Sequence, residues 1–160
     1  MILLLQSYAY ILIVLLALCG FFVAFHIHKH KKPGKAPLIC PARFECQAVV
    51  HSDYSKFLNI PLEFWGMGYY AFIFCAYLFL ILFPQDLSIA MSLMLVLLSK
   101  IAFLFSLYLI SVQIFILKKG CLWCFISAFV SILIFILALL SYDLFELLLD
   151  LSSVYFSFLL

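Results

Sequence analysis

The sequence predicts an all-α membrane protein, a bundle of four transmembrane helices with a long polar loop between the first and second helices. Of its 160 residues, 69% are hydrophobic and 10% are charged, whereas soluble proteins have roughly 45–50% apolar and about 25% charged residues. Long apolar runs dominate, and the short alternating segments of a transmembrane β-barrel are missing. We therefore expect residues 1–160 to form one helical domain surrounded largely by lipid.

The first transmembrane helix is expected at about residues 2–25, because a helix needs about 20 apolar residues to cross the hydrocarbon core. This run is longer than the apolar region of a typical signal peptide, and it lacks a basic start and a small-residue cleavage site. It is therefore expected to stay in the membrane, followed by a polar loop at residues 26–61. The remaining apolar runs predict transmembrane helices at about residues 62–83, 87–117 and 122–140.

The apolar run at residues 87–117 is expected to form one helix, because two crossings and a turn would need more than about 40 residues. Its first part, residues 87–96, then becomes an interfacial extension. After the fourth helix, three acidic residues spaced three and four apart form a stripe on an apolar tail. Residues 143–160 are therefore expected to lie on the membrane as an amphipathic helix.

A single third helix places two cysteine pairs on the same side of the membrane. The second and third helices return the chain to the face that it left. The loop with Cys40 and Cys46 and the turn with Cys121 and Cys124 therefore share that face. Two helices within residues 87–117 would instead separate the pairs by the bilayer.

The motif Cys121-Leu122-Trp123-Cys124 begins the fourth predicted helix. Cysteines three apart on a helical turn share a face. The positive end of the helix dipole favours a thiolate there, and we expect Lys118 and Lys119 to add to that field and lower the pKa of Cys121. The motif alone also fits half of a zinc site or two packed thiols.

Cys40 and Cys46 enclose five residues, a longer gap than that of a tight zinc knuckle. The gap suits a small loop closed by a disulfide that opens and re-forms through thiolate attack. This would make the loop between the first and second helices an active-site loop, and the protein a thiol–disulfide oxidoreductase. A purely structural disulfide, or a non-enzymatic membrane protein with a structural or metal-binding cysteine cluster, is the alternative.

Four elements in this order resemble the vitamin K epoxide reductase family in its bacterial and archaeal form. The resemblance covers most of the chain, from the first predicted helix to the fourth. Its elements are Cys40-x5-Cys46, Ser52, the stretch Asn59-Ile60-Pro61-Leu62-Glu63-Phe64-Trp65-Gly66, and Cys121-x2-Cys124.

The resemblance implies a four-helix bundle around a quinone, such as ubiquinone or menaquinone, and no metal. Cys40 would react with a thioredoxin-like thiol oxidase, Cys46 would exchange with Cys121, and Cys124 would face the quinone. A nucleic acid partner is not expected.

Three further residues are candidates for contact with the quinone. Ser52 matches a serine near the quinone head group in the family. Trp65 and Tyr69 fall where the second helix would line the quinone pocket, although aromatic residues at a membrane interface explain them equally well.

The chain also departs from parts of the family. Leu62 and Ala128 stand where the eukaryotic enzymes carry an asparagine and a tyrosine at the vitamin K head group, so epoxide reduction is not expected. Many bacterial relatives carry a fused thioredoxin-like domain, whereas this sequence stops at Leu160. We therefore expect its thioredoxin-like partner to act in trans.

Two arguments conflict over which side of the membrane the cysteines face. Every basic residue except Lys100 lies on the cysteine side, which by the positive-inside rule predicts the cytoplasm. Disulfides belong instead to oxidising compartments outside it, and the family chemistry normally oxidises exported proteins. We expect a multi-pass protein of the cell or inner membrane with its active-site cysteines on the extracytoplasmic face.

Overall fold

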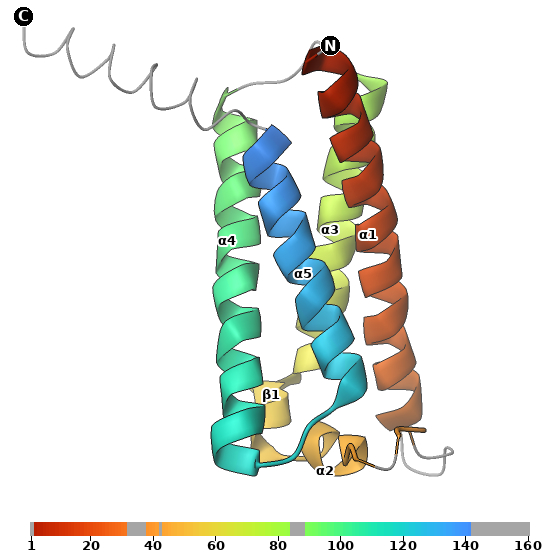
Figure 1. Cartoon of the computed structure of the whole chain (residues 1–160), viewed down its shortest axis with the longest axis vertical. Helices are drawn as coiled ribbons and strands as arrows, with labels where there is room; N and C mark the ends of the chain where they lie inside the picture. The colour runs from red at the N-terminus through yellow and green to blue at the C-terminus, as the bar shows by residue number, and fades with distance from the viewer. Residues whose placement is uncertain (1, 32–37, 42, 84–88, 142–160) are drawn as a thin grey trace, which may run out of the picture.

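Four long helices run side by side in the computed structural model, which describes residues 2–31, 38–41, 43–83 and 89–141 (Figure 1). They are α1 (Ile2–Lys31), α3 (Leu62–Leu82), α4 (Ile89–Ser111) and α5 (Leu122–Ser141). Each is long and apolar enough to cross a membrane, and α4 does so together with the π-helical segment η3 (Val112–Leu117) that continues it. The prediction of an all-α bundle of four transmembrane helices is confirmed. The predicted tail helix at residues 143–160 lies outside the described residues.

Helix α1 continues past Phe25, where the apolar run predicted its end, and stops only at Lys31. A helix satisfies its own backbone, so it need not end where the hydrocarbon ends. Its last turn carries His28, Lys29, His30 and Lys31, and cations there interact favourably with the helix dipole. The first residues of the predicted loop are therefore helical.

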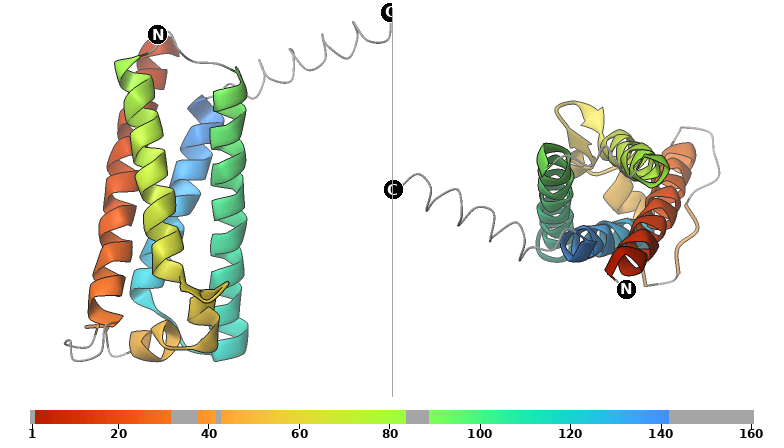
Figure 2. Two further views of the ribbon diagram at one scale, coloured as in Figure 1. Left: turned by 180° about the vertical axis from the view of Figure 1, so that it is seen from behind. Right: turned by 90° about the horizontal axis from the view of Figure 1, so that it is seen from above.

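The helices form a ring in which one side is looser than the others (Figure 2). Helix α1 packs against both α3 and α5, and α4 packs against α5, whereas α3 and α4 make few close backbone contacts. The core between them is almost entirely apolar. Its most deeply buried members are Ile13, Ala17, Ile73, Tyr77, Leu95 and Ile134.

Three helices meet at Tyr70 of α3, which is buried. Its hydroxyl donates to the Ser127 carbonyl oxygen on α5 at 2.7 Å. Its ring lies against Gly20 of α1, where a Cβ atom would be 2.6 Å from Tyr70 Cδ1. The absence of a side chain at Gly20 thus lets α1 and α3 approach closely around a ring that α5 holds in place.

The segment between α1 and α3 folds across one end of the bundle (Figure 1). It contains α2 (Cys46–Val50), the 3-10 turn η1 (Asp53–Ser55) and an antiparallel hairpin of β1 (Lys56–Phe57) and β2 (Ile60–Pro61). The turn between α4 and α5 lies at the same end. Both cysteine-bearing segments therefore meet at one end of the bundle.

We predict that Gly20→Ala destabilises the bundle, whereas Gly68→Ala does not. Within a helix, alanine is favoured over glycine by up to about 1 kcal/mol. At Gly20 the added methyl group would collide with Tyr70, and overpacking of this kind costs about 1–3 kcal/mol. At Gly68 of α3 nothing lies within 4 Å of the new atom.

The thermal stability of the two variants can be compared in detergent by size-exclusion chromatography after heating. The measured quantity is the temperature at which half of the protein no longer elutes as a monodisperse peak. It should fall for Gly20→Ala and stay level or rise for Gly68→Ala. Equal temperatures for the two variants would show that α1 and α3 are not packed around Tyr70.

Candidate active site

The loop pair is joined in a disulfide between Cys40 and Cys46. Cys46 begins α2 and is 2% exposed, whereas Cys40 is half-buried. The Phe44 N–H donates to the Pro41 carbonyl oxygen at 2.8 Å, and this turn brings the two cysteines together. Cys40 is thus the more accessible sulfur of the pair.

The second pair lies where α5 begins. Cys121 is fully buried and directly precedes the helix, and Cys124 follows in its first turn. The Cys124 thiol donates to the Cys121 sulfur, with 2.6 Å between the two Sγ atoms, and the Cys124 N–H also points to that sulfur at 3.3 Å. Neither cysteine is in a disulfide, so the structure shows the loop pair bonded and the pair at α5 unbonded.

Hydrogen bonding lowers the pKa of Cys121. The largest contribution is the hydrogen bond from the Cys124 thiol, and the backbone N–H groups of Cys124 and Trp123 add to it against the opposing effect of burial. Donors of this kind favour the thiolate, which is the reactive form of cysteine. Hydrogen bonds, and not the predicted field of Lys118 and Lys119, account for this lowered pKa. The Lys119 side chain pairs with Glu45.

The two pairs meet in a single buried apolar cluster. Cys46 and Cys121 are both members, and Cys40 and Cys124 pack against it. The other buried members of this cluster are Ile27, Leu38, Val49 and Val50. Cys46 and Cys121 are therefore the two cysteines that are buried together where the loop packs on the start of α5.

Contacts of Ile39, just before Cys40, and of Phe44, between the two cysteines, hold the loop against the start of α5. The Trp123 indole N–H, between the two cysteines of α5, donates to the Ile39 carbonyl oxygen at 3.3 Å. The ring of Phe44 packs edge-on against Phe125, with 6.4 Å between centroids. Phe44 also covers Gly120, where a Cβ atom would lie 2.9 Å from its ring.

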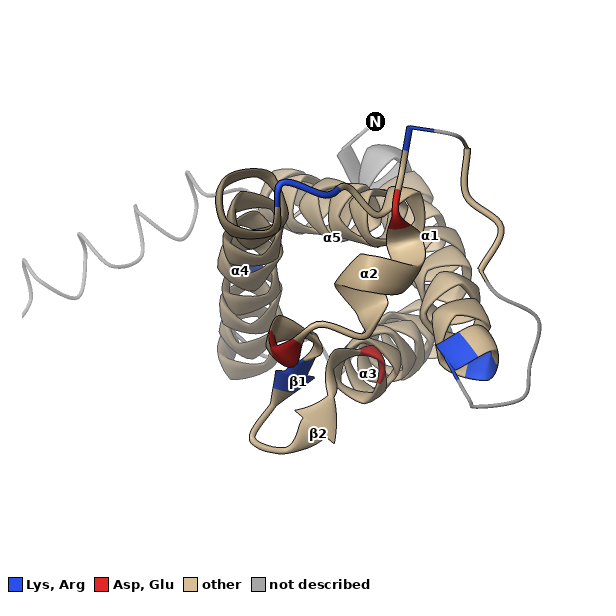
Figure 3. Cartoon of the chain, turned by 90° about the horizontal axis from the view of Figure 1, so that it is seen from below, with Lys and Arg blue, Asp and Glu red and all other residues tan. Residues whose placement is uncertain are grey.

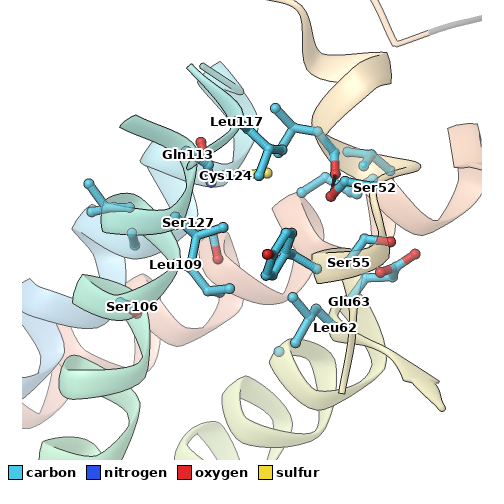
Figure 4. A pocket seen from close by; sticks show the side chains of 18 of the residues that line it. Ser52, Ser55, Leu62, Glu63, Ser106, Leu109, Gln113, Leu117, Cys124 and Ser127 are labelled. Atoms are coloured by element: carbon cyan, nitrogen blue, oxygen red, sulfur yellow. Dashed lines mark hydrogen bonds between the residues drawn. The ribbon is translucent and has the colours of Figure 1, made fainter. Parts of the chain in front are cut away.

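A cavity of about 130 Å³ opens beside Cys124 within the ring of helices (Figure 4). This is roughly ten times the space that one water molecule needs. Its walls are mostly apolar. The polar residues among its lining are Ser52, Tyr54, Ser55, Glu63, Ser106, Gln113, Ser127 and Cys124. An apolar cavity with a few polar groups suits a flat, mainly hydrophobic head group.

The predicted quinone contacts separate into two places. Ser52 lines the cavity, and its hydroxyl donates to the Val49 carbonyl oxygen at 2.7 Å. Trp65 and Tyr69 instead line a groove on the outer face of α3, towards α4. Trp65 is 45% exposed, and its indole N–H donates to the Phe57 carbonyl oxygen at 3.4 Å. The structure brings Ser52, but neither aromatic residue, to the cavity.

A buried ion pair at the rim of the cavity was not apparent from the sequence. Lys31, the last residue of α1, lies 3.0 Å from Glu63 in the first turn of α3, and the two side chains are 15% and 4% exposed. Lys31 also donates to the Ser55 hydroxyl at 3.3 Å. The pair joins α1, α3 and η1. Its residues are 32 positions apart in the chain, so no local pattern reveals it.

We predict that the thiolate of Cys121 forms at a lower pH than that of an ordinary cysteine. A lowered pKa means that the alkylation rate of Cys121 by iodoacetamide reaches half its maximum at a lower pH. The substitution Cys124→Ala removes the donor that contributes most, so that midpoint should rise. Cys75→Ala, on the lipid-exposed face of α3, should leave the midpoint unchanged.

Mass spectrometry of the peptide that contains Cys121, after timed alkylation across a pH series, measures this midpoint. The same midpoint in Cys124→Ala and in the parent protein would contradict the role given to the Cys124 thiol.

Comparison with known protein families agrees with this geometry. A model described as the vitamin K epoxide reductase family matches residues 11–139, which span all four transmembrane helices. No curated protein matches the chain. The family consists of membrane thiol–disulfide oxidoreductases and is linked to quinones, so the protein is an integral membrane oxidoreductase. The chain belongs to the vitamin K epoxide reductase family.

Proposed function

We propose that the protein passes electrons from a reduced thioredoxin-like protein, through Cys40/Cys46 and Cys121/Cys124, to a membrane quinone. It thereby supports disulfide formation in other proteins. The observation that carries this proposal is the position of the pair at α5. Cys121 shares a buried cluster with Cys46, while Cys124 lines the cavity. One cysteine pair thus shares a buried cluster with the loop disulfide and also reaches the cavity that we assign to a quinone.

Electrons would enter at Cys40, because it is more exposed than Cys46. A thiolate of the partner attacks Cys40, the more accessible sulfur, and Cys46 leaves as a thiolate. The second partner thiol then attacks the mixed disulfide. The partner leaves oxidised, and the loop retains two thiols and therefore two electrons.

Transfer to the pair at α5 requires that pair in its oxidised form. The Cys46 thiolate attacks Cys121, and Cys124 leaves as a thiolate. Cys40 then attacks the Cys46–Cys121 bond, which restores the loop disulfide and releases Cys121. The lowered pKa of Cys121 makes it a good leaving group in this step.

The largely apolar lining of the cavity, with its few polar groups, suits a quinone head group. A bound quinone supplies an acceptor for two electrons and two protons, which is what two thiols release on forming a disulfide. Cys124 would lie against the head group, and Ser52 would line the same cavity. Ubiquinone and menaquinone share this chemistry.

The alternative, a non-enzymatic protein with a structural or metal-binding cysteine cluster, has less support. Cys40 and Cys46 are bonded to each other, and bonded sulfurs are not available as thiolate ligands. Within the described part of the chain, no group of three or more His, Cys, Asp or Glu side chains is placed to hold a metal ion. A structural cluster would also leave the cavity beside Cys124 without a purpose.

For the cysteine end of the bundle we propose the extracytoplasmic face, where exported proteins are oxidised. The charge distribution opposes this orientation, since described lysines gather at this end (Figure 3). Two of them, Lys31 and Lys119, are paired with Glu63 and Glu45 at the same end. The positive-inside rule counts lysine and arginine and not net charge, so the proposed orientation rests on the disulfide chemistry alone.

We predict that Cys124→Ala abolishes quinone-dependent oxidation of a reduced thioredoxin-like substrate and leaves the helical bundle intact. Without Cys124 the pair at α5 cannot form a disulfide. The loss of quinone absorbance, followed with purified protein, measures the rate. Cys75→Ala is the matched control and should keep the parental rate. Quinone reduction that survives Cys124→Ala would refute the proposed path.

We also predict that a membrane-impermeant maleimide labels Cys40 on intact cells after mild reduction. Cells made permeable first should show no further labelling of that residue. Labelling that requires permeable cells would place the same chemistry on the cytoplasmic face and refute the proposed orientation.

A further inference from the structure

Gln113 occupies the segment where α4 departs from regular α-helix. Residues Val112–Leu117 form the π-helical segment η3, which ends at Lys118 with a left-handed φ of 51°. Such segments make up well under 1% of residues and occur frequently at functional sites. This one brings the backbone and side chain of Gln113 to the turn before α5. The Lys119 N–H donates to the Gln113 carbonyl oxygen, and the Cys121 N–H donates to Gln113 Oε1, both at 3.2 Å.

The hydrogen bond from the Cys121 N–H determines the orientation of the Gln113 side-chain amide. A backbone N–H can only donate, so the atom that it meets is the amide oxygen. The amide therefore presents its NH₂ group, with two donors, to its other surroundings. Gln113 is 5% exposed and lines the same cavity as Cys124 (Figure 4). The NH₂ group is thus a buried donor at the wall next to the reactive sulfur.

Two hydroxyl groups of the lining, those of Ser52 and Ser127, already donate within the protein, and the other hydroxyl groups belong to Tyr54, Ser55 and Ser106. The Ser52 hydroxyl donates to Val49. Tyr70 donates to the Ser127 carbonyl oxygen, which leaves the Ser127 hydroxyl to donate to Tyr70 at 3.0 Å. Leu62 and Ala128, also in the lining, have no polar side-chain atom. A ligand carbonyl close to Cys124 would therefore find at Gln113, beside Cys124 in Figure 4, a donor that neither Ser52 nor Ser127 supplies.

We propose that Gln113 donates a hydrogen bond to an oxygen of the quinone head group while its own oxygen positions Cys121. This inference rests on the proposed function and adds a specific residue to it. The hydrogen bond stabilises negative charge as it develops on the quinone oxygen. Both electrons come from the two thiols, which become a disulfide, and the two protons of the quinol equal the two that the thiols lose. Gln113 itself is not oxidised, reduced or deprotonated.

Two substitutions separate the two roles. At pH 8 the carboxylate introduced by Gln113→Glu can accept from Cys121 but cannot donate. Gln113→Met keeps the size of the side chain and removes both functions. With a short-chain ubiquinone analogue, both variants should raise KM about tenfold, which corresponds to about 1.4 kcal/mol. Ser111→Ala, which removes a hydroxyl bonded to Leu107 outside the cavity, is the control and should leave KM unchanged.

The positioning role has a readout that does not involve quinone. This readout is the rate of thiol–disulfide exchange between the reduced partner protein and the four cysteines, followed by mass after alkylation. The rate should fall in Gln113→Met. It should be higher in Gln113→Glu than in Gln113→Met. If the parental protein reduces the quinone and KM is unchanged in both variants, the role of Gln113 as a hydrogen-bond donor to the quinone is refuted, while the proposed function is not. Parental exchange in Gln113→Met would overturn the positioning role. A parental protein that reduces no quinone would instead refute the proposed function.

Discussion

Hydrocarbon offers no hydrogen-bond partner to a peptide group, so each crossing of the membrane by this chain is a helix that satisfies its own backbone. Because α4 and η3 together cross once, the segment after α1 and the turn before α5 emerge at the same end. The proposed chemistry depends on this shared location of the two cysteine-bearing segments. The apolar cluster around Cys46 and Cys121 forms only because both segments are delivered to one side.

At that end, the burial of the sulfurs and their hydrogen bonds have opposite effects on reactivity. Burial alone would keep Cys121 as an inert thiol, but donors from Cys124 and Trp123 favour its thiolate. The same burial would keep water away from the proposed exchange between Cys46 and Cys121. Trp123 and Phe44 meanwhile hold the loop in place through contacts with Ile39 and Phe125. The same small set of contacts therefore favours the thiolate of Cys121 and holds the loop disulfide close to the pair at α5.

Hydropathy and spacing were enough to predict the number of helices and the shared face of the cysteines, because both depend on length and order alone. Features that depend on contacts between distant residues were not predictable. The ion pair of Lys31 with Glu63, the π-helical segment and the hydrogen bond of Gln113 with Cys121 belong to this class. The aromatic residues of α3 show a subtler limit. At about 100° per residue, the mean direction of Trp65 and Tyr69 lies only about 60° from that of Leu62 and Gly66, which line the cavity. No feature of the sequence alone fixes that rotation.

Direct exchange between the two cysteine pairs is the claim on which the electron path depends, and trapping its intermediate tests it most directly. In the double variant Cys40→Ala, Cys124→Ala, only Cys46 and Cys121 remain of the four reactive cysteines. Mild oxidation followed by peptide mapping should reveal a bond between Cys46 and Cys121 within one chain. Failure to form that bond, in a protein that still elutes as a folded species, would contradict the path described.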